Sequence, residues 1–329
     1  MKTPSRILIG LVLATSIAAP AALAGPARSV LDRPAVASAK AAHTLLLDVA
    51  QAGSRLVAVG DRGHIVYSDN QGGSWTQASV PVSVMLTAVH FASARQGWAV
   101  GHHGVILHTV DGGVHWTLQR ADREANSEKA GAPLLGVWFA DENTGYAVGA
   151  YGYFLVTHDG GATWTDNASA IANPDAWHLN AIRGRATGPV FIVGEHGKLF
   201  RSMDRGVTWS SLGSPFDGSY FGVSPLSDDL VLIYGLQGRL FASTDQGSSW
   251  HQVQTGVTSG INAAIRLENG KIVVAGNAGV VLVAADKQLD FVPDQRADRQ
   301  SISALLPAGG DGLVTVGEGG AKFIKLGQK

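Results

Sequence analysis

A pair of glycines separated by two residues recurs seven times along the 329-residue chain. The first glycines of successive pairs are 41 to 48 residues apart. A repeat of that length is typical of one four-stranded blade of a β-propeller, in which each unit buries its apolar faces only against its neighbours. The seven pairs are Gly60/Gly63, Gly101/Gly104, Gly149/Gly152, Gly194/Gly197, Gly235/Gly238, Gly276/Gly279 and Gly317/Gly320.

Short β-rich runs flank the glycine pairs, as at residues 56–59 and 64–67 in the first unit. This arrangement predicts a β-hairpin whose glycines supply the positive φ that the turn needs. A further apolar strand precedes the hairpin, at residues 86–91, 134–139, 179–182, 261–265 and 302–306, and a fourth follows an aromatic residue. The sequence therefore predicts an all-β protein, a seven-bladed β-propeller of four-stranded antiparallel blades.

Closure of the ring needs a further segment, because the seventh unit reaches residue 329 before a fourth strand. An open ring would leave one blade with an unpaired edge. We expect residues 28–36 to supply the missing strand of the last blade and so close the ring. Pro34 restricts that strand to an edge position.

The first 24 residues have the organisation of a cleavable export signal. Lys2 and Arg6 give a positive start, residues 7–19 are mostly apolar, and residues 22–24 form an Ala-Leu-Ala cleavage site. The apolar run is shorter than the roughly 20 residues that cross a bilayer, so no transmembrane span is expected after signal cleavage. The chain divides into a signal peptide (1–24), an N-terminal segment with the possible closing strand (25–42) and the propeller (43–329).

The composition fits a protein outside the cytoplasm. The chain has no cysteine, so neither a disulfide nor a lipid anchor on cysteine can form. We expect a periplasmic or secreted product. The 25 basic and 26 acidic residues are nearly balanced, which argues against a nucleic-acid partner.

Five units contain the motif Ser/Thr-x-Asp/Asn-x-Gly-x-x-Trp, which resembles the Asp-box of bacterial neuraminidase repeats. Its central side chain can accept hydrogen bonds from its own turn, while the Trp packs beside the hairpin. A ring of acid catalysts or metal ligands is the alternative, but a residue repeated in every blade serves the blade rather than one site. The central and aromatic residues are Asn70 and Trp75, Asp111 and Trp116, Asp159 and Trp164, Asp204 and Trp209, and Asp245 and Trp250.

The two residues inside each glycine pair differ from unit to unit, as binding residues on a repeating scaffold must. In a propeller these turns share one face with the connections between blades, two of which are longer than the rest, at 120–129 and 167–177. Long loops on one face are typical of a binding face, and solvated loops without a partner are the alternative. The candidate binding residues are Arg62, His102, His103, Tyr151, Trp177, Glu195, His196, Lys198 and Arg239.

The chemistry of these residues does not indicate a cofactor. The histidines lack the spacing that brings three ring nitrogens onto one ion, so we expect neither a metal nor another cofactor. The basic residues Arg62, Lys198 and Arg239, with Arg183 and Arg185 after a first strand, form either a basic patch or scattered single charges.

Asp-box propellers include glycoside hydrolases, which need a close pair of carboxylates. The acids Asp61, Glu195 and Glu318 belong to different blades, with no signature around them. Residues 31–34, the nearest match to the start of sialidases, lack its aromatic residue and its isoleucine. We assign no catalytic residue.

Taken together, the repeats resemble the photosystem II stability/assembly factor family of exported seven-bladed propellers. The resemblance extends over about residues 43–327 and is carried by segments such as 97–104 and 144–149. It implies a propeller without a catalytic role that binds newly made membrane-protein subunits. We therefore expect a periplasmic, non-catalytic binding or assembly propeller whose partner is a membrane protein or membrane-associated complex. The alternative is a carbohydrate-active enzyme of the glycosidase or sialidase type, or a glycan-binding propeller that uses Trp177.

Overall fold

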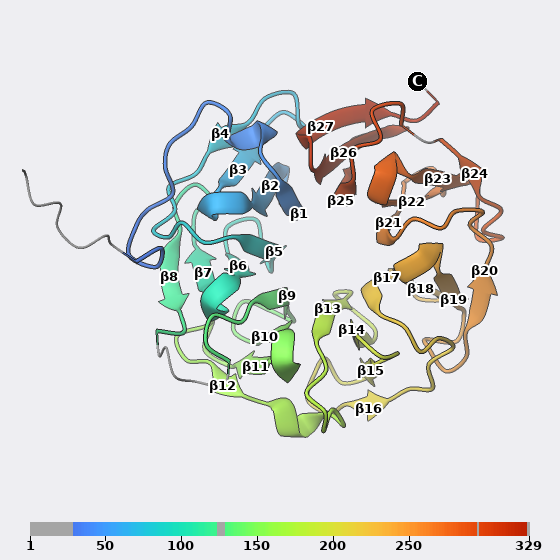
Figure 1. Cartoon of the computed structure of the whole chain (residues 1–329), viewed down its shortest axis with the longest axis horizontal. Coiled ribbons are helices and arrows are strands. Elements are labelled where there is room, and N and C mark those ends of the chain that lie inside the picture. The colour runs from blue at the N-terminus through green and yellow to red at the C-terminus, as the bar shows by residue number, and fades with distance from the viewer. Residues whose placement is uncertain (1–28, 124–128, 295, 328–329) are drawn as a thin grey trace, which may run out of the picture.

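The computed structural model describes residues 29–123, 129–294 and 296–327. In this part of the chain, seven antiparallel sheets stand in a ring, and the first strand of each sheet lies innermost (Figure 1). Six sheets have four strands and the last has three. The predicted seven-bladed propeller is confirmed. The predicted export signal lies outside the described residues.

The strands follow one another within each blade in chain order. Blade 1 contains β1 (Leu46–Ala52), β2 (Arg55–Gly60), β3 (Ile65–Ser68) and β4 (Thr76–Gln77); blade 2 contains β5 (Leu86–Phe91), β6 (Gly97–Gly101), β7 (Ile106–Thr109) and β8 (Thr117–Arg120). Blade 3 contains β9 (Leu134–Phe139), β10 (Gly145–Gly149), β11 (Phe154–Thr157) and β12 (Thr165–Asp166); blade 4 contains β13 (Leu179–Gly184), β14 (Val190–Gly194), β15 (Leu199–Ser202) and β16 (Ser210–Ser211). Blade 5 contains β17 (Tyr220–Ser227), β18 (Leu230–Gly235), β19 (Leu240–Ser243) and β20 (His251–Val253); blade 6 contains β21 (Ile261–Arg266), β22 (Ile272–Gly276), β23 (Val281–Ala284) and β24 (Val292–Pro293). Blade 7 contains β25 (Ile302–Pro307), β26 (Gly312–Gly317) and β27 (Gly320–Lys325).

Short 3-10 turns complete the regular structure. They are η1 (Ala41–His43), η2 (Asp61–Gly63), η3 (His102–Gly104), η4 (Ala150–Gly152), η5 (Ala168–Ala170), η6 (Leu236–Gly238) and η7 (Asn277–Gly279). Five of these turns lie at the glycine pairs of the repeat, each ending at the second glycine of its pair.

The first glycine of each pair is required by a close backbone approach. At Gly101 the backbone is extended, with φ −175°, and a Cβ there would collide with the carbonyl oxygen of Met85. The next residue, His102, donates its N–H to that same carbonyl at 3.0 Å. The equivalent hydrogen bond forms in all seven blades, from Asp61, His102, Ala150, Glu195, Leu236, Asn277 and Glu318. The prediction that the glycines supply a positive φ is therefore wrong for the first glycine of each pair.

Left-handed backbone is found at the second glycine and at the residue before it. The second glycines of the first six pairs have φ between 57° and 74°. The preceding non-glycine residues have φ between 49° and 59°, and they are Arg62, His103, Tyr151, His196, Gln237 and Ala278. Such values disfavour residues with a side chain, so the repeated bonds of the turn hold these residues against their local preference.

Each Asp-box turn forms a local hydrogen-bond network. At Asp204, Oδ1 accepts from the hydroxyl of Ser202 at 2.7 Å and from the N–H of Thr208 at 2.8 Å, while Oδ2 accepts from the hydroxyl of Thr208 at 2.5 Å. These bonds, from Thr208 first, lower the pKa of Asp204 to about 2. Asp111, Asp159 and Asp245 also have pKa values of about 2. The acids serve their own turns.

The aromatic residue of each turn packs at the junction with the preceding blade. Trp116 of blade 2, for example, lies in an apolar cluster with Val57 and Val59 of blade 1. The glycine of the turn meets the same neighbour, since a Cβ at Gly113 would lie 3.0 Å from Cγ2 of Val57. These contacts bury the faces of neighbouring blades against each other.

The same junction closes the ring between blades 7 and 1. A Cβ at Gly72 would lie 2.6 Å from Cγ2 of Val314 in β26. The apolar cluster at this junction joins Leu46 and Val66 of blade 1 to Val316 of blade 7. The ring therefore closes by side-chain packing between blades.

The expectation that residues 28–36 complete the last blade is wrong. The described part of this segment runs beside the connection from blade 1 to blade 2, where Ala35 N–H donates to Val80 at 3.0 Å and Ser83 N–H donates to Val30 at 2.9 Å. Leu31 is 7% exposed and packs into the cluster between blades 1 and 2. Burial of this leucine stabilises the segment between blades 1 and 2.

We expect Gly101→Ala to destabilise the protein by about 2 kcal/mol or more, because the new Cβ must displace backbone. Gly213→Ala is the matched control, since a Cβ there meets nothing within 4 Å, and it should change the free energy of unfolding by less than about 0.5 kcal/mol. Urea unfolding followed by circular dichroism measures both. Equal stability of the two variants would contradict the packing role.

We expect Asp204→Asn to lower the free energy of unfolding at neutral pH but not near pH 2. The folded protein keeps this carboxyl charged down to about pH 2, whereas the unfolded chain protonates it near pH 4, so its stabilisation is present above about pH 4 and lost as the pH falls to about 2. Asn70 already occupies the equivalent position in blade 1, where its Oδ1 accepts from Ser68 at 2.9 Å. The substitution is therefore compatible with the turn.

Urea unfolding of the wild type and of Asp204→Asn at pH 7, 4 and 2.5 tests this expectation. Asp286→Asn is the control, because the degenerate sixth turn gives Asp286 an N–H from Gln288 at 2.9 Å but no glycine at its centre. A difference between wild type and Asp204→Asn that stayed constant with pH would show that the charge does not stabilise the turn.

Candidate functional site

The candidate binding residues in the glycine-pair turns lie on one face of the ring, together with the connections between blades. The left-handed residues of these turns share nearly the same backbone conformation. Their side chains differ in chemistry from blade to blade. The side chain of Arg62 is 78% exposed and contacts its neighbour Asp61 at 3.3 Å. Tyr151 is 53% exposed. This face therefore presents varied side chains at repeating positions.

Four of the predicted residues gather where blade 3 meets blade 4. The rings of Trp177 and His196 lie 3.7 Å apart between centroids, and those of Tyr151 and His178 lie 5.1 Å apart. Nδ1 of His178 is 3.6 Å from Oε1 of Glu195, and the His178 N–H donates to Oε2 at 3.3 Å. We call Tyr151, Trp177, His178, Glu195 and His196 the aromatic cluster.

The longer connection before blade 4 holds the aromatic cluster in place. The side chain of Asn173 donates to the carbonyl of Trp177 at 2.9 Å and accepts from its N–H at 3.2 Å. Ala176, just before the tryptophan, has φ 53°. The extra residues thus form a defined turn that presents the Trp177 ring.

The two histidines of blade 2 lie apart from the aromatic cluster. The backbone N–H of His103 donates to the carbonyl of Gly131 at 3.3 Å, and its backbone carbonyl accepts from the N–H of Asp122 at 2.8 Å. These bonds attach His103 to the charged connection. Burial, together with neighbouring His103, lowers the pKa of His102. Residues 124–128 of this connection lie outside the described residues.

A partly buried carboxylate supports the same connection. Asp122 accepts a short hydrogen bond from the hydroxyl of Tyr153 and one from Arg120 at 2.6 Å. Burial and the Asp122 carboxylate raise the pKa of Tyr153 to about 12. Lys129 lies 4.5 Å from the centre of the Tyr153 ring. These contacts position the connection in front of blade 3.

The predicted basic residues separate into groups. Arg62 belongs to blade 1, whereas Lys198 and Arg239 follow the turns of the adjacent blades 4 and 5, where Arg239 lies 5.8 Å from the Phe216 ring. Arg183 and Arg185 have acidic partners, Asp48 at 3.0 Å and Asp228 at 3.1 Å. Of these five residues, Lys198 and Arg239 are the pair that follows equivalent turns in adjacent blades.

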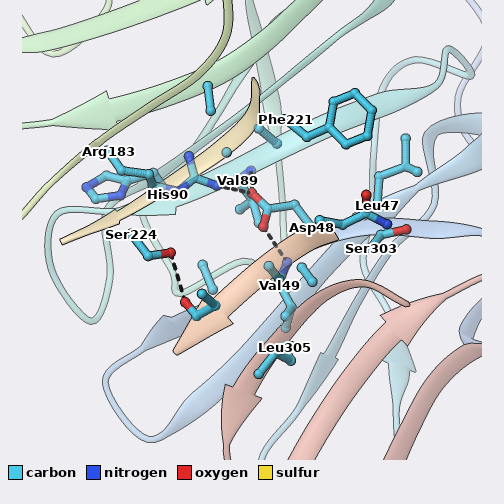
Figure 2. Close-up of a pocket in the computed structure, with 18 of the residues that line it drawn as sticks. Leu47, Asp48, Val49, Val89, His90, Arg183, Phe221, Ser224, Ser303 and Leu305 are labelled. Carbon is cyan, nitrogen blue, oxygen red and sulfur yellow. Dashed lines mark hydrogen bonds and ion pairs between the residues drawn. The ribbon is translucent and has the colours of Figure 1, made fainter. Parts of the chain in front are cut away.

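The central channel contains a chamber of about 460 Å³ that is lined by the innermost strands (Figure 2). Each innermost strand contains one residue that pairs with the residue just before the first glycine of its blade. These seven residues occupy equivalent positions in the seven blades. Six blades have a small residue there, namely Ala88, Gly136, Ala181, Gly222, Ala263 and Ala304, whereas blade 1 has Asp48.

Asp48 ties three blades together inside the chamber (Figure 2). It is 7% exposed, and its carboxylate accepts from the N–H of Val49 in blade 1 and of Val89 in blade 2, each at 3.0 Å. Nη2 of Arg183 in blade 4 donates to Oδ2 at 3.0 Å. Burial raises the pKa of Asp48, and the Arg183 guanidinium opposes that rise.

His90 lies beside this ion pair as a neutral group. Burial, with the nearby Arg183 charge, lowers the pKa of His90 to about 4. Its Nε2 is 3.2 Å from the carbonyl oxygen of Phe139. Because a carbonyl can only accept, Nε2 carries the proton and Nδ1 is unprotonated. The chamber thus contains one ion pair and one neutral imidazole.

Asp48, His90 and His178 were not predicted from the sequence, and Arg183 was predicted only as part of a basic patch or as a scattered single charge. Alignment of the innermost strands would have exposed Asp48, because every other unit has alanine or glycine at that position. No comparable feature of the sequence indicated a role for His90. None predicted the contact between Arg183 and Asp48 either, because these residues are 135 positions apart in the chain.

Three acids of the described chain that lie in the chamber or on the turns each have a partner within the fold. Glu195 contacts His178, Asp48 binds Arg183, and Glu318 accepts from the N–H of Ser301 at 3.0 Å. Over the three described ranges, no group of three or more His, Cys, Asp or Glu residues could hold a metal ion. The same ranges contain no helix that is long and apolar enough to span a membrane.

Residues 67–132 and 129–325 match the family described as Photosynthesis system II assembly factor YCF48. The chain belongs to this family. The match to the YCF48 family begins within β3 and extends to the end of β27, so it includes both long connections and the aromatic cluster. No curated protein sequence matches the chain.

Solved structures show the same fold as this member of the YCF48 family. The structure of "YCF48 bound to D1 peptide" has a TM-score of 0.69 and 16% identity, with 87% of this chain and 94% of the other covered. YCF48 from Cyanidioschyzon merolae has a TM-score of 0.67 and 15% identity, with 86% and 96% covered. The GH74 xyloglucanase from Xanthomonas campestris has a TM-score of 0.64 and 13% identity, with 87% and 52% covered. These identities establish likeness of fold alone.

We expect Arg183→Met to destabilise the protein by about 3 kcal/mol, because it leaves a buried carboxylate without its counter-charge. Asp48→Ala should cost less, since the Arg183 side chain is 35% exposed and water can still solvate it. The double variant should lose less stability than the two single changes together. Urea unfolding of the four proteins completes the cycle, and additive losses would show that the ion pair contributes nothing as a pair.

Proposed function

We propose that this chain is an exported, non-catalytic binding propeller that holds a segment of a membrane protein, or of a membrane-associated complex, during assembly. Membership of the YCF48 family supports a role in assembly. The D1 peptide bound to the YCF48 of similar fold supports a peptide segment as the bound form of the partner. The organisation of residues 1–24 supports export, and the lack of cysteine is compatible with a periplasmic location.

The observation that carries this proposal is the construction of the turn face, which is the face of the ring that carries the glycine-pair turns and the connections between blades. The turns of blades 1 to 6 have a nearly invariant left-handed position whose side chain changes from Arg62 through His103, Tyr151, His196 and Gln237 to Ala278. A scaffold that repeats its backbone conformation and varies its exposed side chains is suited to recognising an extended partner segment. Acid–base catalysis would instead need a convergent pair of groups, and the acids have local partners.

The aromatic cluster is the proposed anchor of this face. Tyrosine and tryptophan supply a large contact area with one polar end, and they dominate many protein interfaces. Tyr151 is exposed, and Trp177 is held by Asn173 rather than buried in a core. Lys198, in the same blade as His196, and Arg239, in the next blade, add positive charge to this face, which suits a partner segment with acidic residues.

A glycan is the second candidate ligand, because the Trp177 ring and the Glu195 carboxylate are the side-chain types that hold sugars by stacking and hydrogen bonding. His196 already covers part of the Trp177 ring, with centroids 3.7 Å apart. Glu195 is also engaged with His178. These contacts favour the peptide proposal over the glycan one.

We expect the double change Tyr151→Ala and His196→Ala to reduce recovery of a specific membrane protein by about tenfold, because two anchors are lost. The mature protein would be tagged, crosslinked in the native envelope and purified with its partner. Gln237→Ala is the matched control, since Gln237 has φ 56° at the equivalent position of blade 5. A triple change at Arg62, Lys198 and Arg239 to alanine tests the basic residues separately.

The proposed function is wrong if no membrane protein is recovered and the purified propeller instead binds or cleaves glycans. If a membrane protein is recovered equally by the wild type and the double variant, the aromatic cluster is not the anchor. Circular dichroism and thermal unfolding of each variant show whether the ring remains folded.

A further inference from the structure

Blade 7 has an outer edge unlike those of the other blades. Its last strand, β27 (Gly320–Lys325), has six residues, and within the described ranges it pairs only with β26. The outermost strands of the other six blades have two to four residues. Short edge strands protect a sheet against pairing with another chain, whereas a longer regular edge is a template for it. Figure 1 shows β27 on the perimeter of the ring.

The register of the hairpin determines which groups face outward. The Gly317–Gly320 pair closes a two-residue loop, and pairing continues through Thr315 and Lys322 to Gly312 and Lys325. A two-residue loop closes on a hydrogen-bonded pair, and such pairs alternate along an antiparallel ladder. The N–H and C=O groups of Ala321, Phe323 and Lys325 therefore point away from β26, toward the free edge.

An exposed aromatic side chain, that of Phe323, lies near the middle of this edge. Phe323 is 51% exposed, whereas Ile324 packs against the apolar cluster between blades 6 and 7. Nζ of Lys322 is 3.0 Å from Oδ2 of Asp298 and also contacts Gln300, so its charge is compensated within the chain. Lys325, the last residue of the strand, is exposed. The edge combines outward backbone groups and an exposed aromatic ring with one exposed lysine at its end.

We propose that β27 pairs with β27 of a second copy of this chain, antiparallel across a two-fold axis that passes beside Phe323. This interface is distinct from the turn face proposed to hold a membrane protein. The two three-stranded sheets of blade 7 then form one continuous six-stranded sheet. A two-fold interface needs a surface that complements itself, and the alternation of this strand provides one.

The pairing centred on Phe323 follows from three constraints. Outward groups must oppose outward groups, so Phe323 faces Phe323 of the other copy, and Ala321 faces Lys325. A pairing centred on Lys322 would place two lysines directly opposite, which is destabilising. A pairing centred on Ile324 would leave the first residues of the strand unpaired. The Phe323 register alone pairs the strand along its length, gives an aromatic pair and places no lysine opposite a lysine.

Sedimentation velocity of the full chain, from about 5 to about 500 μM, tests the proposal, because pairing of one strand edge buries less surface than a standard stable interface and should give a weak dimer. We expect dimer to increase with concentration. Phe323→Pro should raise the dissociation constant by about tenfold or more, since the lost N–H points to the free edge and not to β26. Circular dichroism should show an unchanged propeller.

Two further variants make the result specific. Phe323→Thr keeps every backbone donor and should weaken the dimer less than proline does. Val292→Thr is the matched control, because Val292 is 67% exposed on β24, the outer strand of blade 6, and it should leave the dimer unchanged.

The proposal is overturned if the wild type remains monomeric across the whole concentration range. It is also overturned if Phe323→Pro dimerises as tightly as the wild type, or if Val292→Thr weakens the dimer equally. A monomeric wild type whose Phe323→Pro variant loses a crosslinked membrane protein would show that the edge accepts a strand from another protein, and the dimer would be wrong.

Discussion

The fold depends on one backbone contact that is made seven times. In each blade, the residue after the first glycine of the pair donates its N–H to the carbonyl that precedes the innermost strand. The glycine lies so close to this carbonyl that no side chain fits between them. This contact joins the inner end of one hairpin to the start of its own blade, and it places the left-handed residue of the turn on the same face in blades 1 to 6. The varied side chains of that face are presented by this shared geometry.

Packing between blades completes what the backbone contact begins. In blades 2, 4 and 5 the glycine of the Asp-box turn meets the second strand of the preceding blade, and the contact of Gly72 with Val314 continues this pattern across the junction of blades 7 and 1. A ring closed in this way does not require a strand from the N-terminal segment, which packs through Leu31 between blades 1 and 2. One consequence is that blade 7 keeps a free outer edge in the described part of the chain, from which the proposed self-association follows.

The two polar regions of the molecule have different characters. In the chamber, Asp48, Arg183 and two backbone N–H groups satisfy one another, and this arrangement joins blades across the ring. On the turn face, Tyr151 is exposed and the Trp177 ring is presented by an extended connection. A group whose hydrogen bonds are complete within the fold stabilises that fold, whereas exposed aromatic side chains are available to a partner. The proposed binding role therefore rests on the turn face.

The sequence by itself determined the number of blades, the order of strands and the position of each turn, because glycine spacing and apolar alternation reflect local geometry that repeats. It also identified Tyr151, Trp177, Glu195 and His196, which stand in turns or in a long connection. Only the tertiary structure decided that these four residues meet, that His178 joins them and that Arg183 reaches Asp48 from a blade on another side of the channel. It also decided where residues 29–36 pack. Such contacts depend on how separate units are placed around the ring, and a one-dimensional repeat does not encode which residues of different units come together.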